Sequence, residues 1–237
     1  MSSKKRDDAP RGSARASGVP PEVAAIRSQI RDFLDSETTD GQKIGNAKFG
    51  IYAFFDYDGE PVYVGQTYES LRQRIGRHLT NQRTDAVAMS VLDPFEVAEI
   101  EVWPMLELAG TASRDLRTKA LLDAAEYTVF QMLLKKSTFG AVLNEGDIAR
   151  TEIVPLPKSY RQRIIPAELY NNRKHPDVRI ARRATTIANL ARVISERDVS
   201  KGLRRTLVTQ AQRLEKLAAD RFKEIGGEIP MGDPEEL

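Results

Sequence analysis

The sequence predicts an α+β fold: a small sheet in the order β-β-α-β-α, flanked by helices and extended by helices at both ends. Two observations predict it. Short apolar and aromatic runs bounded by turn residues lie between 49 and 103, and the segments before and after them have apolar residues at helical spacing. Hydrophobic residues make up 41% and charged residues 30% of the 237 residues, which is typical of a globular protein.

The first 48 residues are expected to form an arm and a helix. Residues 1–19 are rich in Ser, Gly, Ala and charged residues and contain almost no apolar ones, so we expect a disordered arm. Pro20 and Pro21 then open a helix that runs to about Ser36, because proline is well tolerated in a first helical turn. A polar linker completes the segment 20–48.

The predicted core spans 49–148 and begins with a hairpin. Its first strand runs from Phe49 to Asp56, and Asp58-Gly59 is a turn signal. Its second strand is short, Val62 to Val64, and Gly65 ends it. The hairpin is therefore expected to supply two neighbouring strands of the sheet.

Three further elements complete the predicted core. A helix runs from about Ser70 to Leu79, residues 81–94 are expected to form a loop or irregular insert, and a strand covers Glu96 to Trp103. Ser113 can then cap a long helix that ends near Lys136, because its hydroxyl can accept a hydrogen bond from a backbone amide of the first turn.

Residues 149–226 are expected to form a basic, mostly helical extension for DNA binding or dimerisation, and 227–237 a loose tail. From 150 to 183 there are nine Lys and Arg against three Asp and Glu, a surplus that suits a polyanion or a solvated helix face. Prolines break this stretch into short pieces, and two amphipathic helices follow at 178–197 and 201–225.

The composition excludes several classes of protein and site. The absence of cysteine excludes disulfides, thiol nucleophiles and cysteine-ligated zinc, and two histidines exclude a histidine-rich metal site. Any metal is expected to be held by carboxylate oxygens, which suits magnesium. There is no apolar run of the roughly 18–20 residues that a bilayer requires and no apolar signal segment, so we expect a cytoplasmic protein without membrane contact.

Two tripeptides on the predicted hairpin stand out, Gly50-Ile51-Tyr52 and Tyr63-Val64-Gly65. Either alone is explained by sheet packing, because Tyr and Gly are common in hairpins. Their combination with later residues is more informative. The next helix carries Arg74 and His78 at i and i+4, which places them on one face, and the long helix that follows carries Glu126.

This pattern resembles the GIY-YIG nuclease superfamily over residues 50–146, with Val in place of Ile in the second tripeptide. The resemblance implies an endonuclease that hydrolyses DNA phosphodiester bonds with Mg²⁺ or Mn²⁺. It implies catalytic roles for Tyr52, Tyr63, Arg74, His78, Glu126 and Asn144.

Each of these side chains suits a step of phosphodiester hydrolysis. Arg74 can donate a forked pair of hydrogen bonds to phosphate oxygens and keeps its charge. Glu126 is expected to bind the metal; the alternative is a polar helix flank, because Asp123 is a neighbour.

The remaining groups would activate water and support the site. The resemblance suggests that Tyr52, shifted toward phenolate by the cation, activates the water, with His78 or Tyr63 aiding it. Asn144 is expected to hydrogen-bond within the site or to hold the Glu126 helix in place.

Basic and polar residues outside this set are candidates for DNA contact, with solvated surface or an ordered loop cap as the alternative. Gln66 and Thr67 follow the second tripeptide, and Arg72 and Arg77 lie on the helix of Arg74. The candidates in the extension are Asn171, Asn172, Arg173, Lys174, His175, Arg179, Arg182 and Arg183.

The extensions bear on the type of nuclease. Without cysteine there is no zinc finger, and the residues after 148 are too few for a second nuclease domain. A core with helices at both ends resembles the type II restriction endonucleases of this superfamily. That branch implies a homodimer, at least on double-stranded DNA, which cuts a short palindromic site and has a companion DNA methyltransferase in function. The alternatives are a homing, repair or junction nuclease, or a non-catalytic nucleic-acid-binding protein on this scaffold.

Overall fold

A computed structural model describes residues 18–79, 93–144 and 148–228 of the chain. Nearly all of the predicted arm (1–19) and insert (81–94), and most of the tail (227–237), lie outside these ranges. In the described part, no helix is long and apolar enough to cross a membrane.

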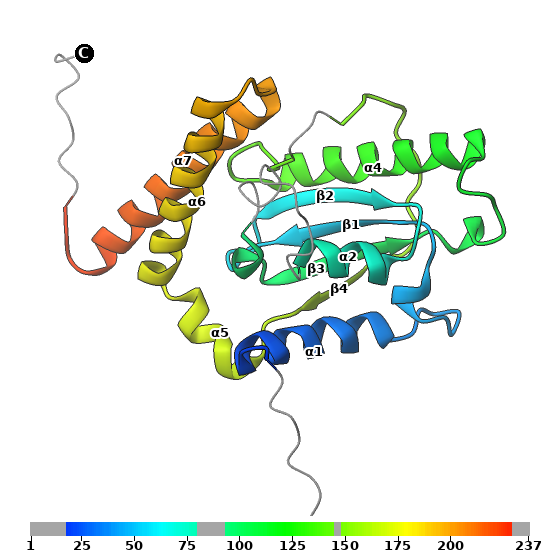
Figure 1. Cartoon of the computed structure of the whole chain (residues 1–237), viewed down its shortest axis with the longest axis horizontal. Coiled ribbons are helices and arrows are strands. Elements are labelled where there is room, and N and C mark those ends of the chain that lie inside the picture. Colours follow the sequence, from blue (N-terminus) through cyan, green and yellow to red (C-terminus); the bar gives the residue numbers. More distant parts are fainter. Residues whose placement is uncertain (1–17, 80–92, 145–147, 229–237) are drawn as a thin grey trace, which may run out of the picture.

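The centre of the fold is a four-stranded antiparallel sheet in the order β2-β1-β3-β4 (Figure 1). The strands are β1 (Gly50–Phe55), β2 (Pro61–Thr67), β3 (Glu99–Pro104) and β4 (Tyr160–Arg163). Strands β1 and β2 form the predicted hairpin, in which Tyr52 lies opposite Gly65. The α+β class is confirmed.

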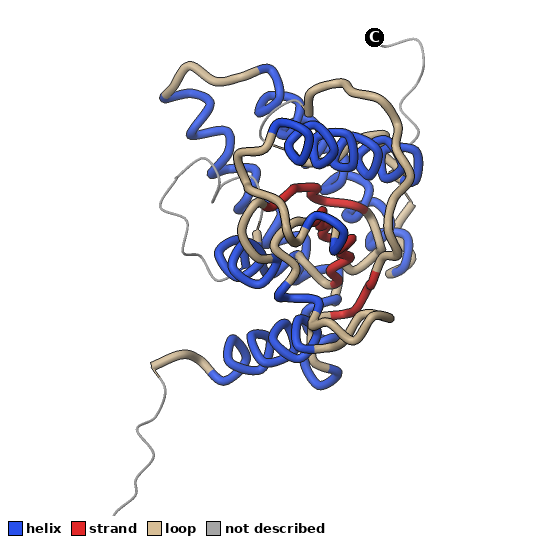
Figure 2. The backbone as a smooth tube through the Cα atoms, turned by 90° about the vertical axis from the view of Figure 1, so that its right-hand side faces the viewer, coloured by secondary structure: helices blue, strands red, loops and turns tan. Residues whose placement is uncertain are grey.

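Helices cover both faces of the sheet (Figures 1 and 2). The side chains of Ile51, Ala53 and Phe55 pack with α4 (Leu116–Lys136), whereas Tyr52 and Phe54 face the cluster that includes α1 and α2. Helix α1 is Pro21–Asp35 and α2 is Leu71–Leu79. Because side chains alternate along a strand, β1 serves both cores and is fully buried.

The C-terminal region is helical, as the sequence predicts. Helix α5 is Ala167–Lys174, α6 is Pro176–Glu196 and α7 is Lys201–Glu224. Helices α6 and α7 pack side by side at one end of the sheet (Figure 1). Leu190, Val193 and Leu203 join the core that contains α1 and α2, so the extension is an integral part of the fold.

Several predicted boundaries are wrong. Strand β2 continues through Gly65 to Thr67, because its backbone stays paired with β1. Strand β3 begins only at Glu99, since Pro94–Glu96 forms a 3-10 turn. Helix α4 is capped by Asp115, whose carboxylate accepts a hydrogen bond from the Thr118 amide, and Ser113 lies outside the helix.

One strand of the sheet, β4, was not expected from the sequence. Strand β4 lies in the stretch that prolines were expected to break into short pieces. It is four residues long, YRQR, polar and largely exposed. An edge strand of this kind has no apolar alternation, so its pairing with β3 is decided by backbone hydrogen bonds.

Candidate active site

The two predicted tyrosines face the same side of the hairpin, toward α2. The rings of Tyr52 on β1 and Tyr63 on β2 are stacked with centroids 6.0 Å apart. Gly65 lies opposite Tyr52, and a Cβ at that position would stand 2.5 Å from the Tyr52 hydroxyl and 2.8 Å from the Tyr63 ring. The second tripeptide therefore requires glycine, because any side chain would displace both rings.

Helix α2 brings Arg74 and His78 to the Tyr52 hydroxyl. Arg74 Nε donates to the Tyr52 oxygen at 3.2 Å, and His78 Nε2 lies 3.0 Å from the same oxygen. Arginine cannot accept a hydrogen bond, so the tyrosine oxygen accepts from Arg74, and the tautomer of His78 sets the direction of the bond between Tyr52 and His78. Tyr52 and His78 are both buried, and the three side chains form a continuous hydrogen-bonded chain behind Gly65.

An open pocket of about 470 Å³ lies along β2. It brings together Tyr63, Arg74 and Glu126 from β2, α2 and α4. The other lining residues are Gly65, Gln66, Thr67, Tyr68 and Glu69. In the described part of the chain, the terminal nitrogens of Arg74 have no hydrogen-bond or ion-pair partner, so they are available to an anion in the pocket.

Glu126 carries a strongly perturbed carboxyl group. Burial, and then the neighbouring Asp123 carboxylate, raise the pKa of Glu126 to about 7, while Arg74 and the Gln66 backbone amide oppose the shift. The ionised form is thus poorly compensated by the protein's own groups. A cation at this position would supply the missing compensation.

The oxygen atoms of the pocket fit a hard divalent cation. Besides the Glu126 carboxylate, Gln66 Oε1 is buried and has no hydrogen-bond partner among the described residues. Carboxylate and amide oxygens are the ligands that Mg²⁺ takes, together with water and phosphate. In the described ranges, no group of three or more His, Cys, Asp or Glu side chains is placed to hold a metal. Glu126 would therefore be the principal protein ligand.

The region that contains most of this pocket matches a known protein family. Residues 48–131 match the model of the GIY-YIG catalytic domain. The matched region contains both tyrosines, Arg74, His78 and Glu126, and the match indicates a nuclease. No curated protein and no solved structure matches the chain.

The pKa of Tyr52 bears on the water-activating role expected for this residue. Burial, and then Tyr63, raise the pKa of Tyr52 well above its ordinary value, and Arg74 opposes this only in part. The protein's own groups thus favour the neutral phenol, and the expected shift toward phenolate stays a prediction that depends on the cation. His78 is placed to accept the proton of Tyr52.

Asn144 supports the second tripeptide from outside the pocket. Its Nδ2 donates to the Val64 carbonyl at 2.8 Å and its Oδ1 accepts from the Val64 amide at 3.2 Å. The Leu143 amide donates to the Val62 carbonyl at 3.0 Å. Asn144 therefore pairs with the outer edge of β2 and fixes the strand that carries Tyr63.

The candidate DNA contacts within the GIY-YIG region divide into two groups. Gln66 and Thr67 line the pocket, although Thr67 is buried. The two α2 arginines are already paired. Arg72 Nη2 donates to Asp35 at 2.8 Å, and Arg77 Nη1 donates to Glu69 at 3.0 Å. A phosphate would have to compete with these carboxylates.

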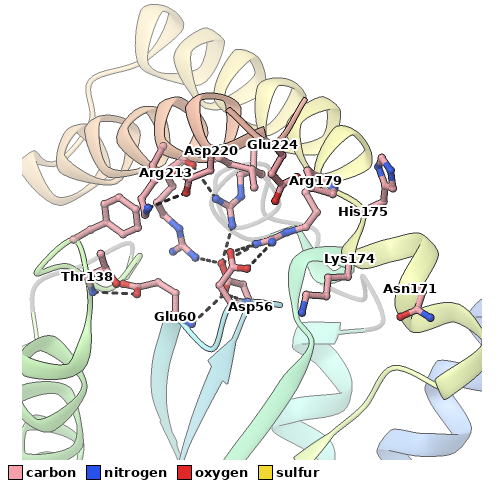
Figure 3. Close-up of a pocket in the computed structure, with 16 residues that line it drawn as sticks. Asp56, Glu60, Thr138, Asn171, Lys174, His175, Arg179, Arg213, Asp220 and Glu224 are labelled. Carbon is pink, nitrogen blue, oxygen red and sulfur yellow. Dashed lines mark hydrogen bonds and ion pairs between the residues drawn. The ribbon is translucent and has the colours of Figure 1, made fainter. Parts of the chain in front are cut away.

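Part of the basic charge of the extension is buried within the fold. Arg179 and Arg183 of α6 and Arg213 of α7 place their guanidinium groups around Asp56, at the end of β1, as Figure 3 shows for Arg179 and Arg213. Their Nη2 atoms lie 3.3, 2.7 and 2.6 Å from Asp56 Oδ2. All four residues, called here the Asp56 cluster, are at most 5% exposed.

The Asp56 cluster corrects part of the predicted DNA-binding set. Arg179 and Arg183 meet carboxylates, and Arg173 is buried against Glu22 at 2.9 Å. Desolvated, paired guanidinium groups are not presented to a phosphate. Arg182 is partly exposed and lies over the Phe95 ring.

Four polar candidates of the extension remain at the surface. Asn171, Asn172, Lys174 and His175 are exposed, on α5 and at the start of α6. Three of them border the pocket of about 620 Å³ drawn in Figure 3. This second pocket lies beside the Asp56 cluster and is separate from the pocket that contains Glu126 and Arg74.

The sequence analysis did not single out Asp56, Arg213 or Tyr68, and it treated Asp123 only as a neighbour of Glu126. Asp56 is the last residue of the first predicted strand, close to the turn signal Asp58-Gly59, where an aspartate needs no further explanation. Asp123 lies three residues before Glu126 on one helix face, and this spacing was the one available signal.

Proposed function

We propose that this chain is a metal-dependent endonuclease that hydrolyses phosphodiester bonds of double-stranded DNA. One observation carries the proposal: a single pocket joins Glu126, Arg74 and Tyr63, and the buried Tyr52–His78 pair lies directly behind its Gly65 wall. The groups come from three different elements of the matched region, so their convergence is a property of the fold.

Arg74 is the proposed phosphate ligand. Its Nε is held by Tyr52, which leaves the two terminal nitrogens directed to the pocket for non-bridging oxygens. Because the guanidinium is planar and anchored at Nε, it is preorganised for the extra negative charge of the transition state. Glu126 would hold the cation, which when bound polarises the phosphate and stabilises the leaving 3′ oxygen.

Tyr52 and His78 are the proposed proton acceptors. As the attacking water loses a proton to the Tyr52 oxygen, the Tyr52 proton passes to His78 Nε2, 3.0 Å away. This transfer avoids a free phenolate, which the raised pKa of Tyr52 disfavours. Tyr63 lines the pocket and would orient the water.

Plasmid cleavage tests the proposal. Supercoiled DNA is incubated with the protein and Mg²⁺, with EDTA in a parallel reaction, and Glu126→Ala serves as the matched variant. We expect Mg²⁺-dependent nicking or linearisation by the wild type, and DNA binding without cleavage by the variant, because phosphate contacts supply most of the affinity. A wild type that shifts DNA in a gel and leaves it intact with Mg²⁺ would be a binding protein on a nuclease scaffold.

The finer proposal is a type II restriction endonuclease that acts as a dimer on a short palindromic site. It is supported by the helices added at both ends of the matched region and by apolar side chains exposed on α7, namely Val208 and Phe222. One chain carries one set of catalytic groups, so two symmetric copies are the simplest way to break both strands. Its companion would be a DNA methyltransferase that protects the same site.

Sedimentation of the protein alone and on DNA, combined with mapping of the cut ends, tests this finer proposal. A dimer on the duplex and paired cuts related by twofold symmetry are expected. A monomer acting at an asymmetric site, or cleavage confined to branched DNA, would exclude a restriction endonuclease and favour repair or junction processing.

A further inference from the structure

The wall of the active-site pocket contains a polar pair that none of the proposed catalytic roles uses. Asp123 Oδ1 accepts a hydrogen bond from Gln66 Nε2 at 2.8 Å, and the Tyr68 hydroxyl lies 3.4 Å from the same oxygen. Asp123 and Glu126 are one turn apart on α4, so they share a face of the helix. Gln66 lies on β2 and lines the pocket together with Glu126.

The Asp123 carboxylate decides which way the Gln66 amide points. An amide end group has a donor nitrogen and an acceptor oxygen, and a carboxylate can only accept. If the amide were reversed, two acceptor oxygens would face each other at hydrogen-bond distance. The nitrogen is therefore held on Asp123, and Oε1 is turned to the other side of the amide.

The oxygen that results is unsatisfied. Gln66 Oε1 is buried and has no hydrogen-bond partner among the described residues, a state that is unfavourable for a polar atom. The Gln66 backbone amide acts on the Glu126 carboxyl group, which places this residue beside the proposed metal ligand. Mg²⁺ binds oxygens at about 2.0–2.1 Å, which is closer than a hydrogen-bonded water molecule approaches them.

We propose that Gln66 Oε1 is a second protein ligand of the divalent cation, and that Asp123 is the positioning residue that orients it. The inference rests on the proposed function and deepens it. A single carboxylate leaves the cation free to shift along the pocket, whereas two oxygens from β2 and α4 fix its place relative to Arg74.

Direct measurement of Mn²⁺ binding tests the inference without relying on cleavage. The full chain is titrated with Mn²⁺, and free Mn²⁺ is followed by electron paramagnetic resonance. Gln66→Leu removes the oxygen and keeps the side-chain volume, and we expect its Kd for Mn²⁺ to rise about 10–100-fold. Gln162→Leu on the exposed strand β4 is the matched control and should bind as the wild type does.

A swapped pair separates metal binding from folding. In the double variant Gln66→Glu/Asp123→Asn, the amide introduced at position 123 can donate to the carboxylate introduced at position 66, and the total charge of the pair is unchanged. A carboxylate oxygen then replaces Gln66 Oε1, so we expect Mn²⁺ affinity at least equal to that of the wild type. The melting curve of each variant, followed by circular dichroism without metal, verifies that the chain is folded.

The outcomes are distinct. If folded Gln66→Leu binds Mn²⁺ as the wild type does while Glu126→Gln does not, the inference is wrong and the proposed nuclease stands. If the swapped pair is folded but loses Mn²⁺ binding together with Gln66→Leu, the oxygen at position 66 is not a ligand. If the wild type itself binds no Mn²⁺ at millimolar concentration, the inference and the metal part of the proposed function both fail.

Discussion

The Tyr52 hydroxyl on β1 lies 3.0 Å from Nε2 of His78 on α2, within the buried layer between the sheet and that helix. Arg74 donates to the same oxygen, and in the His78 tautomer that carries its proton on Nδ1 the tyrosine hydroxyl donates to Nε2. Tyr52 and His78 are 26 positions apart in the sequence. The first tripeptide and helix α2 are therefore joined in one hydrogen-bonded unit. Changes that disturb this unit should affect cleavage before they affect folding.

Gly65→Ala should reduce the cleavage rate about 100-fold. The added Cβ would lie 2.5 Å from the Tyr52 hydroxyl, so the ring must move away from Arg74 and His78. Misplacement of a catalytic group by about 1 Å is enough for such a loss. The measurement is single-turnover cleavage of a plasmid.

Gly76→Ala on α2 is the matched control for Gly65→Ala. A Cβ at Gly76 meets no atom of the described residues within 4 Å. Alanine should keep the cleavage rate and stabilise the helix by about 0.5–1 kcal/mol. Equal cleavage by both variants would mean that the Gly65–Tyr52 contact has no part in the reaction.

Arg74→Lys should lower the cleavage rate about 100–1,000-fold, with little change in DNA affinity. Lysine keeps the positive charge but cannot hold Tyr52 through Nε and offer two further nitrogens to a phosphate. Rates at saturating enzyme and gel-shift affinities are compared for the two proteins. A lysine variant within a few-fold of the wild-type rate would reduce Arg74 to a general cation.

Glu126→Gln should stabilise the metal-free protein at pH 8. The folded-state pKa of about 7 lies above the ordinary value of 4.5, so ionisation favours the unfolded chain. The stability that the protonated Glu126 side chain contributes is fully present below pH 4.5 and is lost as the pH rises through 7. Glutamine mimics the protonated form and should raise the free energy of unfolding at pH 8 by about 1–3 kcal/mol.

Urea unfolding with EDTA at about pH 4 and pH 8 measures this difference between Glu126→Gln and the wild type. At the lower pH the side chain at position 126 should contribute equally to the free energy of unfolding of the two proteins. Mg²⁺ at the higher pH should stabilise only the wild type, because a ligand that binds the folded state stabilises it by mass action. If Glu126→Gln had a lower free energy of unfolding than the wild type at the higher pH, the raised pKa of Glu126 would be contradicted.

Asp56→Asn should destabilise the fold by about 3–5 kcal/mol, because it leaves the three arginines of the Asp56 cluster without their shared carboxylate. Asp58→Asn is the control: its side chain is 53% exposed, and its pair with Arg179 should contribute less than about 1 kcal/mol. Urea midpoints give both values. Similar small losses in the two variants would show that the cluster does not hold α6 and α7 to the sheet.

The local sequence determined much of this protein. The turn at Asp58-Gly59 and the apolar runs around it fix the hairpin, so both tyrosines could be placed on neighbouring strands. The spacing of Arg74 and His78 fixes their common face on α2. These features depend on residues within a few positions of one another, and the periodicity of a helix or strand is visible there.

Only the tertiary structure decided where the charges and unpaired polar atoms lie. Asp56 and Arg213 are 157 positions apart and meet because α7 packs at the end of the sheet. In the sequence an arginine that binds a carboxylate looks the same as one that binds a phosphate, since the same guanidinium group serves both partners. Gln66 likewise becomes a candidate ligand through a contact between two elements. Asp123 on α4 binds the amide nitrogen of Gln66, and the amide oxygen of Gln66 then has no partner among the described residues.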